Sequence, residues 1–171
     1  MKRSALVLGI LVAAGGAASA QEEPTGSWAD ETSAFYFARG GCATDGTYIY
    51  LFGGYQLGVS QSYPSYYRRA RRYDPAANAW ITLANLPIAA SNITYQYNAG
   101  ACHDGNLYSF GTSWQDGNGI VLRYSISDDA WTVLDGVTLP ESRYGAAAAV
   151  LGNLIYISGG YAGAPSRRVD T

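Results

Sequence analysis

The residues that could do chemistry in this chain are few, and histidine is the scarcest. His103 is the one histidine among 171 residues, and Cys42 and Cys102 are the two cysteines. A zinc-type centre needs about three or four protein ligands, so the sequence does not supply a histidine-rich metal site. We predict no metal and no cofactor, and we find no set of side chains spaced for catalysis.

Aromatic side chains offer a different chemistry, which is ligand binding. Tyr63, Tyr66, Tyr67 and Trp114 lie in segments rich in Tyr, Ser and Gly. That mixture forms adaptable contact surfaces in binding loops. These four residues are candidates for contact with a sugar or a peptide. The alternative is that they pack locally and order long loops.

Arginine is the second candidate for binding. Arg143 follows Leu139-Pro140-Glu141-Ser142, and its guanidinium could hold a ligand carboxylate. The alternative is a structural hydrogen-bond donor to neighbouring loops. A denser run, Arg68-Arg69-Ala70-Arg71-Arg72, begins a predicted strand, so alternate arginines point to opposite faces. It is either an anion site or a solvated strand end with salt bridges.

A repeat positions these residues. Three segments are alike: DGTYIYLFGG at 45–54, DGNLYSFGT at 104–112 and GNLIYISGG at 152–160. Tyr73-Asp74 and Trp80 follow the first, and Tyr124-Ser125 and Trp131 follow the second, 51 residues later in each case. Each unit holds apolar runs of strand length between Gly, Pro, Asn and Asp, which indicates an all-β fold.

This pattern resembles the kelch family of β-propellers, whose repeat is about 50 residues long. The family signature is an apolar run before Gly-Gly, then Tyr-Asp, then Trp, and the resemblance covers nearly all of residues 37–171. The second unit departs from it, with Gly111-Thr112 for the glycine pair and Tyr124-Ser125 for Tyr-Asp. The signature residues are expected to be structural: Gly53, Gly54, Tyr73, Asp74, Trp80, Gly111, Tyr124, Trp131, Gly159 and Gly160.

The resemblance implies kelch-type propeller blades of four antiparallel strands in an incomplete ring, with about two full blades and parts of two others. We expect blades at 37–94 and 95–142, a partial blade at 143–171, and in 21–36 a possible ring-closing strand at Trp28. The expected strands are 39–44, 47–52, 67–73, 79–83, 95–102, 106–111, 120–125, 130–134, 144–150, 153–158 and a strand cut short at the C-terminus. Propellers have about four to eight blades, so further downstream blades or self-association should close the ring.

The alternation of strand direction predicts one loop face. The links between second and third strands (55–66, 112–119 and 160–166) should emerge beside the blade-to-blade links (84–94 and 135–142). Binding residues favour such loops on a rigid scaffold. Cys42 and Cys102 fall in equivalent strands but one position out of step, so their side chains should point to opposite faces. We therefore favour two separate buried thiols, and a disulfide remains the alternative.

The N-terminus predicts export. Lys2 and Arg3 precede a short apolar run, and Ala18-Ser19-Ala20 offers a cleavage site, so residues 1–20 read as a signal peptide of a secreted or periplasmic protein. No membrane span is expected after cleavage. Nine arginines and no lysine then remain against thirteen acidic residues. A net acidic chain lacks the phosphate-neutralising attraction that drives nucleic-acid binding, so we predict no nucleic-acid partner.

These observations favour a binding module that recognises a protein or a glycan through its loop face. One alternative is a carbohydrate-active enzyme, because exported kelch-like propellers include sialic-acid mutarotases and sugar oxidases. The copper centre of the oxidases needs histidine and tyrosine ligands, which this segment with His103 alone does not supply. Another alternative is a purely structural repeat domain, since fold alone does not decide function.

Overall fold

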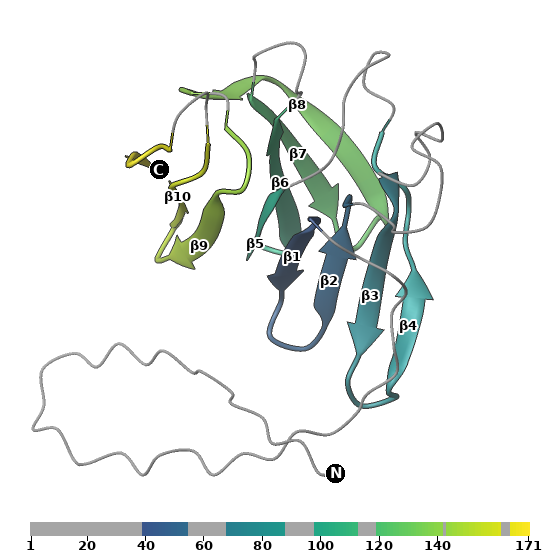
Figure 1. Ribbon diagram of the computed structural model, residues 1–171. Helices are drawn as coiled ribbons and strands as arrows, with labels where there is room; N and C mark the ends of the chain where they lie inside the picture. Colours follow the sequence, from purple (N-terminus) through teal and green to yellow (C-terminus); the bar gives the residue numbers. More distant parts are fainter. Residues whose placement is uncertain (1–38, 55–67, 88–97, 113–118, 142, 162–164) are drawn as a thin grey trace, which may run out of the picture. The chain divides into compact units, whose positions relative to one another are not determined.

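The computed structural model describes residues 39–54, 68–87, 98–112, 119–141, 143–161 and 165–171. All of them belong to the compact unit Ala34–Thr171, and the other unit, Met1–Ser33, lies outside the described residues. The described part consists of three antiparallel sheets, which we call blades 1, 2 and 3 (Figure 1). In each sheet, strands that are consecutive in the chain are hydrogen-bonded neighbours. The predicted all-β fold of four-stranded antiparallel blades is confirmed.

Blade 1 contains β1 (Gly41–Thr44), β2 (Ile49–Phe52), β3 (Ala70–Asp74) and β4 (Ala79–Thr82). These strands fall within two or three residues of the predicted ranges, because short runs of β-branched and aromatic residues stop at Gly, Asp and Asn. The turn between β1 and β2 is organised by Asp45, whose Oδ1 accepts hydrogen bonds from the backbone N–H groups of Thr47 at 2.8 Å and Tyr48 at 2.7 Å.

Blade 2 contains β5 (Ala99–His103), β6 (Asn106–Thr112), β7 (Gly119–Ser125) and β8 (Ala130–Leu139). Asp104 and Gly105 form a two-residue turn with φ of 46° and 69°, as in the type I′ turns that match the twist of a hairpin. β8 is longer than the predicted 130–134, and its last residues pair with Gly119 and Ile120 beyond a bulge. Residues 135–139 are therefore strand, and the prediction of a free link over 135–142 is wrong for them.

Blade 3 contains β9 (Ala147–Leu151), β10 (Leu154–Ser158) and the short β11 (Val169–Asp170). Ile157 pairs with both Ala148 and Asp170 across β10, so the third strand is in register with the other two. β9 begins three residues later than expected. The segment before it makes a single bridge between Tyr144 and Tyr161 instead of a strand.

Two apolar clusters hold the blades together. The first, between blades 1 and 2, includes Phe52 and Leu86 on one side and Leu122 and Tyr124 on the other. The second, between blades 2 and 3, includes Phe110 and Ile157. Blade 2 thus buries one sheet face against blade 1 and the other against blade 3, as stacked repeats do.

The first strands of the three blades lie side by side, with β5 between β1 and β9 (Figure 1). A Cβ on Gly100 would lie 2.5 Å from the backbone carbonyl oxygen of Cys42. Glycine therefore allows the backbones of β1 and β5 to approach more closely than a side chain would permit.

The glycine pairs of blades 1 and 3 have positive backbone φ angles. Gly53 and Gly54 have φ of 69° and 82°, and Gly159 and Gly160 have φ of 69° and 92°. Such angles are strained for residues with a Cβ. Gly111 differs, since it continues β6 as a paired strand residue, and a Cβ there would lie 2.8 Å from Asn98 Oδ1. Its role is close packing, which is where blade 2 departs from the repeat.

Candidate functional site

The antiparallel topology gives the described blades two different ends. We call the end where β2, β6 and β10 finish and β3, β7 and β11 begin the loop end (Figure 1). The opposite end, with the tight turns around Asp45, Asp104 and Gly152, is the turn end. The long links therefore leave the scaffold from the loop end. Tyr63, Tyr66, Tyr67 and Trp114 belong to those links and lie outside the described residues, so their role as ligand contacts stays a prediction.

Arg143 is the predicted site residue that the structure describes, and it is only 1% exposed. Its Nη1 donates to the backbone carbonyl oxygens of Gly159 and Arg168, each at 3.2 Å, and to Ser166 Oγ at 3.4 Å. Its Nη2 forms an ion pair with the carboxylate of Asp170. These contacts match the structural interpretation of Arg143, because its charge is neutralised inside blade 3.

A second layer of polar contacts surrounds this ion pair. Ser166 Oγ accepts from the Arg168 backbone N–H and donates to Glu141 Oε2, both at 3.2 Å. Arg168 Nε forms a further ion pair with Asp170. Charge-assisted contacts of this kind are stronger than neutral ones. They tie the start of β11 to the segment before β9, so the loop end of blade 3 is a fixed surface.

Tyr144 and Tyr161 form an aromatic pair at this end of blade 3. Their ring centroids are 5.3 Å apart, and their backbones exchange hydrogen bonds of 3.1 and 2.9 Å. Tyr161 is 41% exposed. The sequence placed it in a binding loop without selecting it, because nothing in the sequence showed that Tyr144 would support its ring.

The arginine run at 68–72 alternates between faces, as predicted. Arg71 pairs in register with Leu51, and Arg72 pairs with Tyr50 on the other face of β2 and β3. The Arg72 guanidinium lies 4.2 Å from the centre of the Tyr48 ring, a cation–π contact. Arg68 Nε donates to the Leu86 carbonyl oxygen at 2.5 Å. Arg72 thus packs within blade 1. Arg68 lies at the loop end of the same blade.

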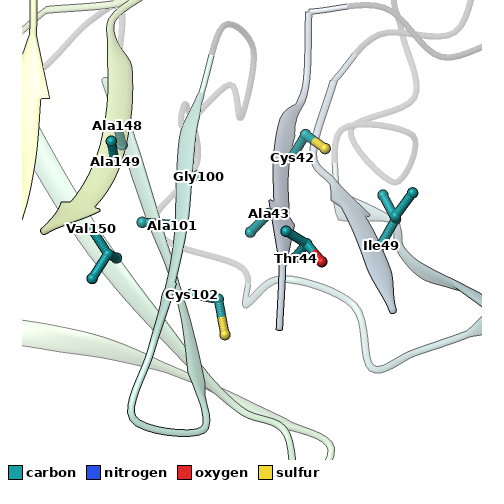
Figure 2. A pocket seen from close by; sticks show the side chains of 10 residues that line it. All are labelled: Cys42, Ala43, Thr44, Ile49, Gly100, Ala101, Cys102, Ala148, Ala149 and Val150. Carbon is teal, nitrogen blue, oxygen red and sulfur yellow. The ribbon is translucent and has the colours of Figure 1, made fainter. Parts of the chain in front are cut away.

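A hollow of about 460 Å³ lies along the first strands of the blades. Figure 2 shows its lining, which is mostly glycine, alanine and other small residues of β1, β5 and β9 together with Cys42, Cys102 and Ile49. Both cysteines are free. The prediction that both thiols are buried is wrong, since Cys42 is exposed and Cys102 is half-buried. Desolvation by the surrounding protein raises the pKa of both thiols, which keeps them protonated and weakly nucleophilic.

The remaining candidate chemistry is sparse. His103 Nε2 lies 3.5 Å from Asp104 Oδ2 at the turn end. Within the described ranges, no three His, Cys, Asp or Glu side chains gather in a way that could hold a metal ion. The same part of the chain contains no helix that is long and apolar enough to span a membrane.

Asn98 is a buried polar residue that sequence reasoning missed. It is 7% exposed and immediately precedes β5 at the loop end, and neither its Oδ1 nor its Nδ2 has a hydrogen-bond partner. A buried amide without partners is costly. No sequence pattern marks Asn98 as buried, because an asparagine before a strand is an ordinary turn residue.

Comparisons with known proteins agree with this architecture. A family model described as the kelch motif matches residues 37–87 and 142–171. Blade 2 falls largely between these matches. This agrees with its departures from the repeat, since Thr112 replaces the second glycine of the pair and Ser125 replaces the aspartate of Tyr-Asp. Stacked four-stranded sheets with this repeat define kelch-type β-propeller blades.

Individual relatives carry the same name. Kelch-like protein 15 of Gallus gallus is 31% identical over 120 residues, which are 66% of this chain and 22% of that protein. The Homo sapiens protein of that name is 28% identical over 120 residues, 66% of this chain and 18% of its own length. Kelch-like protein 26 of Danio rerio is 36% identical over 91 residues, 53% of this chain and 14% of that protein. The chain contains kelch repeats, and its matches span about a fifth or less of these relatives.

Proposed function

We propose that this chain is a binding module that recognises a partner protein through the loop end of its blades. The observation that supports this most is that the packed sheets and the long links are separate parts of each blade. Strand pairing and the two apolar clusters form a rigid scaffold, and the links that can vary leave it from one end. Loops on a rigid scaffold are the usual place for binding residues.

The chemistry of the loop end supports a protein partner. Tyr161 is exposed and supported by Tyr144, and arginines immediately precede β3 and β11. Tyrosine and arginine are the residue types enriched at protein interfaces. A glycan partner is the alternative for the same surface, since aromatic rings also stack on sugars.

The test is selection of ligands followed by mapping. The chain is immobilised, and peptides are selected from a displayed random library, with a glycan array probed in parallel. Retained ligands are then measured against Tyr66→Ala, Trp114→Ala and Tyr161→Ala at the loop end and His103→Ala at the turn end. We expect peptide ligands whose affinity falls with the loop-end variants and not with His103→Ala. Ligands that respond only to His103→Ala, or to none of the four changes, would contradict the proposal.

We also propose that the protein is exported and that residues 1–20 are removed. The support is the positive start at Lys2 and Arg3, the short apolar run and the small residues Ala18-Ser19-Ala20. Expressed with its own N-terminus in a bacterial host, the protein should be found outside the cytoplasm and begin at Gln21. N-terminal sequencing checks this, and exported protein that retains Met1 would contradict it.

A further inference from the structure

The second half of β8 contains an irregular stretch that the proposed binding surface does not use. The ladder between β7 and β8 is regular up to the pair Leu122–Val133 and resumes at the pair Ile120–Thr138. Between these pairs β7 contributes one residue, whereas β8 contributes the four residues 134–137. A bulge of this kind leaves main-chain groups outside the ladder. Because β8 is the last strand of its sheet, no other described strand of blade 2 covers the bulge from outside.

Asp135 and Gly136 lie in the middle of this bulge, and both are exposed. Gly136 has φ of 78°, and a Cβ built on it would meet no atom within 4 Å. No hydrogen bond or ion pair joins the Asp135 carboxylate to the described part of the chain. Segments with few contacts and exposed main chain open locally at little cost. The pair therefore combines an unrestrained carboxylate with main chain that has room to move.

The chemistry open to such a pair is ring closure between side chain and main chain. The Gly136 nitrogen attacks the carboxyl carbon of Asp135, so that a C–N bond forms and a carboxyl C–O bond breaks. The departing oxygen takes the N–H proton and one proton from solvent and leaves as water. A five-membered succinimide ring remains. Glycine favours this step, because a residue without a Cβ lets the two groups approach each other.

Hydrolysis of the ring gives two products. Water adds to one of the two ring carbonyls and breaks the bond between that carbonyl and the Gly136 nitrogen. Opening at the side-chain carbonyl restores aspartate. Opening at the main-chain carbonyl gives isoaspartate, in which the chain runs through the former side chain and is one carbon longer. The whole sequence of steps needs no reactant besides water.

Asp45-Gly46 has the same residue types, but hydrogen bonds hold its carboxylate. Asp45 Oδ1 accepts from the backbone N–H groups of Thr47 at 2.8 Å and Tyr48 at 2.7 Å. Asp45 Oδ2 accepts from the Tyr50 hydroxyl at 2.7 Å. Ring closure would have to break these bonds, so the fold protects this pair.

Asp104-Gly105 is held by its turn. The two residues form the hairpin turn that the pair His103–Asn106 closes. Asn106 Nδ2 donates to the Asp104 carbonyl oxygen at 2.7 Å, and His103 Nε2 lies 3.5 Å from the Asp104 carboxylate. The peptide bond that would have to rotate is thus fixed on both sides.

We propose that Asp135-Gly136 is a site of spontaneous covalent modification, at which the aspartate isomerises to isoaspartate through a succinimide. Among the Asp-Gly pairs that the structure describes, it is the one whose carboxylate and following peptide bond are both unrestrained. The product changes blade 2 near its loop end, because the extra carbon enters between the paired segments on either side of the bulge. The inference is independent of what the loop end binds.

Incubation of the whole chain in heavy-oxygen water measures the reaction, because each ring opening places one solvent oxygen in the carboxyl group. After transfer to ordinary water, trypsin separates the sites, since cleavage after arginine gives peptide 40–68 with Asp45 and peptide 124–143 with Asp135. We expect at least about tenfold more heavy oxygen in peptide 124–143, because the hydrogen bonds of Asp45 must break before its ring can close. Electron-transfer fragmentation of peptide 124–143 should show isoaspartate at position 135.

Two controls assign the reaction to the residue and to the fold. Asp135→Glu keeps the charge but would need a six-membered ring, which closes far more slowly, so peptide 124–143 of this variant should lose its heavy oxygen. In the chain unfolded by urea, Asp45 and Asp135 should react at similar rates, because the hydrogen bonds that protect Asp45 are gone.

Asp104 is measured in peptide 73–123. Asp116→Glu and Asn118→Gln are introduced first, because Asp116 and Asn118 also precede glycines in this peptide. Heavy oxygen at Asp104 should then stay as low as at Asp45.

Three results would overturn the inference. Equal labelling of peptides 40–68 and 124–143 in the folded chain would show that the fold does not select Asp135. Heavy oxygen that persists in peptide 124–143 of Asp135→Glu would move the reaction to Asp128 or Asp129. Labelling in urea without labelling of the folded chain would show that the bulge holds Asp135 as firmly as the turns hold the other aspartates.

Discussion

Asp129 is a single residue that touches two blades. Its Oδ1 accepts from the Ala84 backbone N–H of blade 1 at 2.8 Å and from the Tyr124 hydroxyl of blade 2 at 2.7 Å. Trp131 Nε1 returns a hydrogen bond to the Ala84 carbonyl oxygen at 3.0 Å. The sequence indicated Tyr124 and Trp131 as packing residues. It did not indicate Asp129, because its partner Ala84 is 45 residues away.

The carboxylate of Asp129 makes blade packing dependent on pH. Its hydrogen bonds, first that from Ala84 and then that from Tyr124, lower its pKa. A group whose pKa is lower in the folded state stabilises it fully above the unfolded value of about 3.9 and loses that effect as pH falls through the folded pKa.

We expect Asp129→Asn to remove this pH dependence. Asparagine keeps an acceptor oxygen and tolerates the positive φ of 48°, as Asn78 does at the same place in blade 1 with Tyr73 as its donor. The urea midpoint of the wild type should fall more steeply than that of the variant as the pH falls below about 4. Asp128→Asn is the comparison: hydrogen bonds from Ser125 and Ser127 also lower the pKa of Asp128, but they lie within one turn, so this variant should flatten the curve less than Asp129→Asn. Parallel curves for wild type and Asp129→Asn would contradict the prediction.

Trp131 gives a second prediction at this scale. Its ring lies 5.0 Å from that of Tyr124 and 5.4 Å from that of Phe52 across the blade interface. Trp131→Ala should lower the free energy of unfolding by about 3 kcal/mol, the lower end for a large aromatic because Trp131 is only half-buried. Trp114→Ala should leave stability nearly unchanged and reduce ligand affinity. Equal loss of stability in both variants, measured by urea unfolding, would place Trp114 in the scaffold.

At the scale of elements, the first strands depend on close backbone contact. Gly100→Ala would bring a Cβ to 2.5 Å from the Cys42 carbonyl oxygen, whereas Gly111→Ala would meet Oδ1 at the end of the Asn98 side chain at 2.8 Å. A backbone atom cannot move aside alone. We therefore expect Gly100→Ala to destabilise by about 2–3 kcal/mol and Gly111→Ala by less. Urea unfolding of both variants checks the order, and a reversed order would show that β1 and β5 separate easily.

The strands themselves were largely predictable, and the exceptions have physical causes. Hydrophobic alternation and turn residues located β2, β6 and β10 because those signals are local. The extension of β8 was missed because Gly136, with φ of 78°, interrupts the pattern, and its pairing with Gly119 and Ile120 is decided by the partner strand.

The candidate site was less predictable than the strands. Arg143 was found from its place before an inner strand, but its neutralisation by Asp170 depends on how β11 folds back. The sequence also did not show that Arg69 and Arg168 occupy equivalent positions, each accepting a backbone hydrogen bond from the first glycine of a pair, Gly53 or Gly159. The links from Gly53 to Arg69 and from Gly159 to Arg168 differ in length, so spacing along the chain does not align them.

At the scale of the whole molecule, the net acidic charge argued against a nucleic-acid partner, and this expectation stays a prediction. Net charge is a coarse guide to any one surface, since charges beyond about 10 Å are screened at moderate salt. The expectation that further blades or self-association close the ring stays a prediction.

The pairing of only consecutive strands has a consequence for how the protein is made. Each described sheet is a continuous stretch of chain, and its hydrogen bonds need no residue from a later blade. Domains can fold as they emerge during synthesis, and local pairings close quickly. Blade 1 can therefore form its sheet while blade 2 is still being synthesised. Each new blade can then pack against the folded sheet of the blade before it.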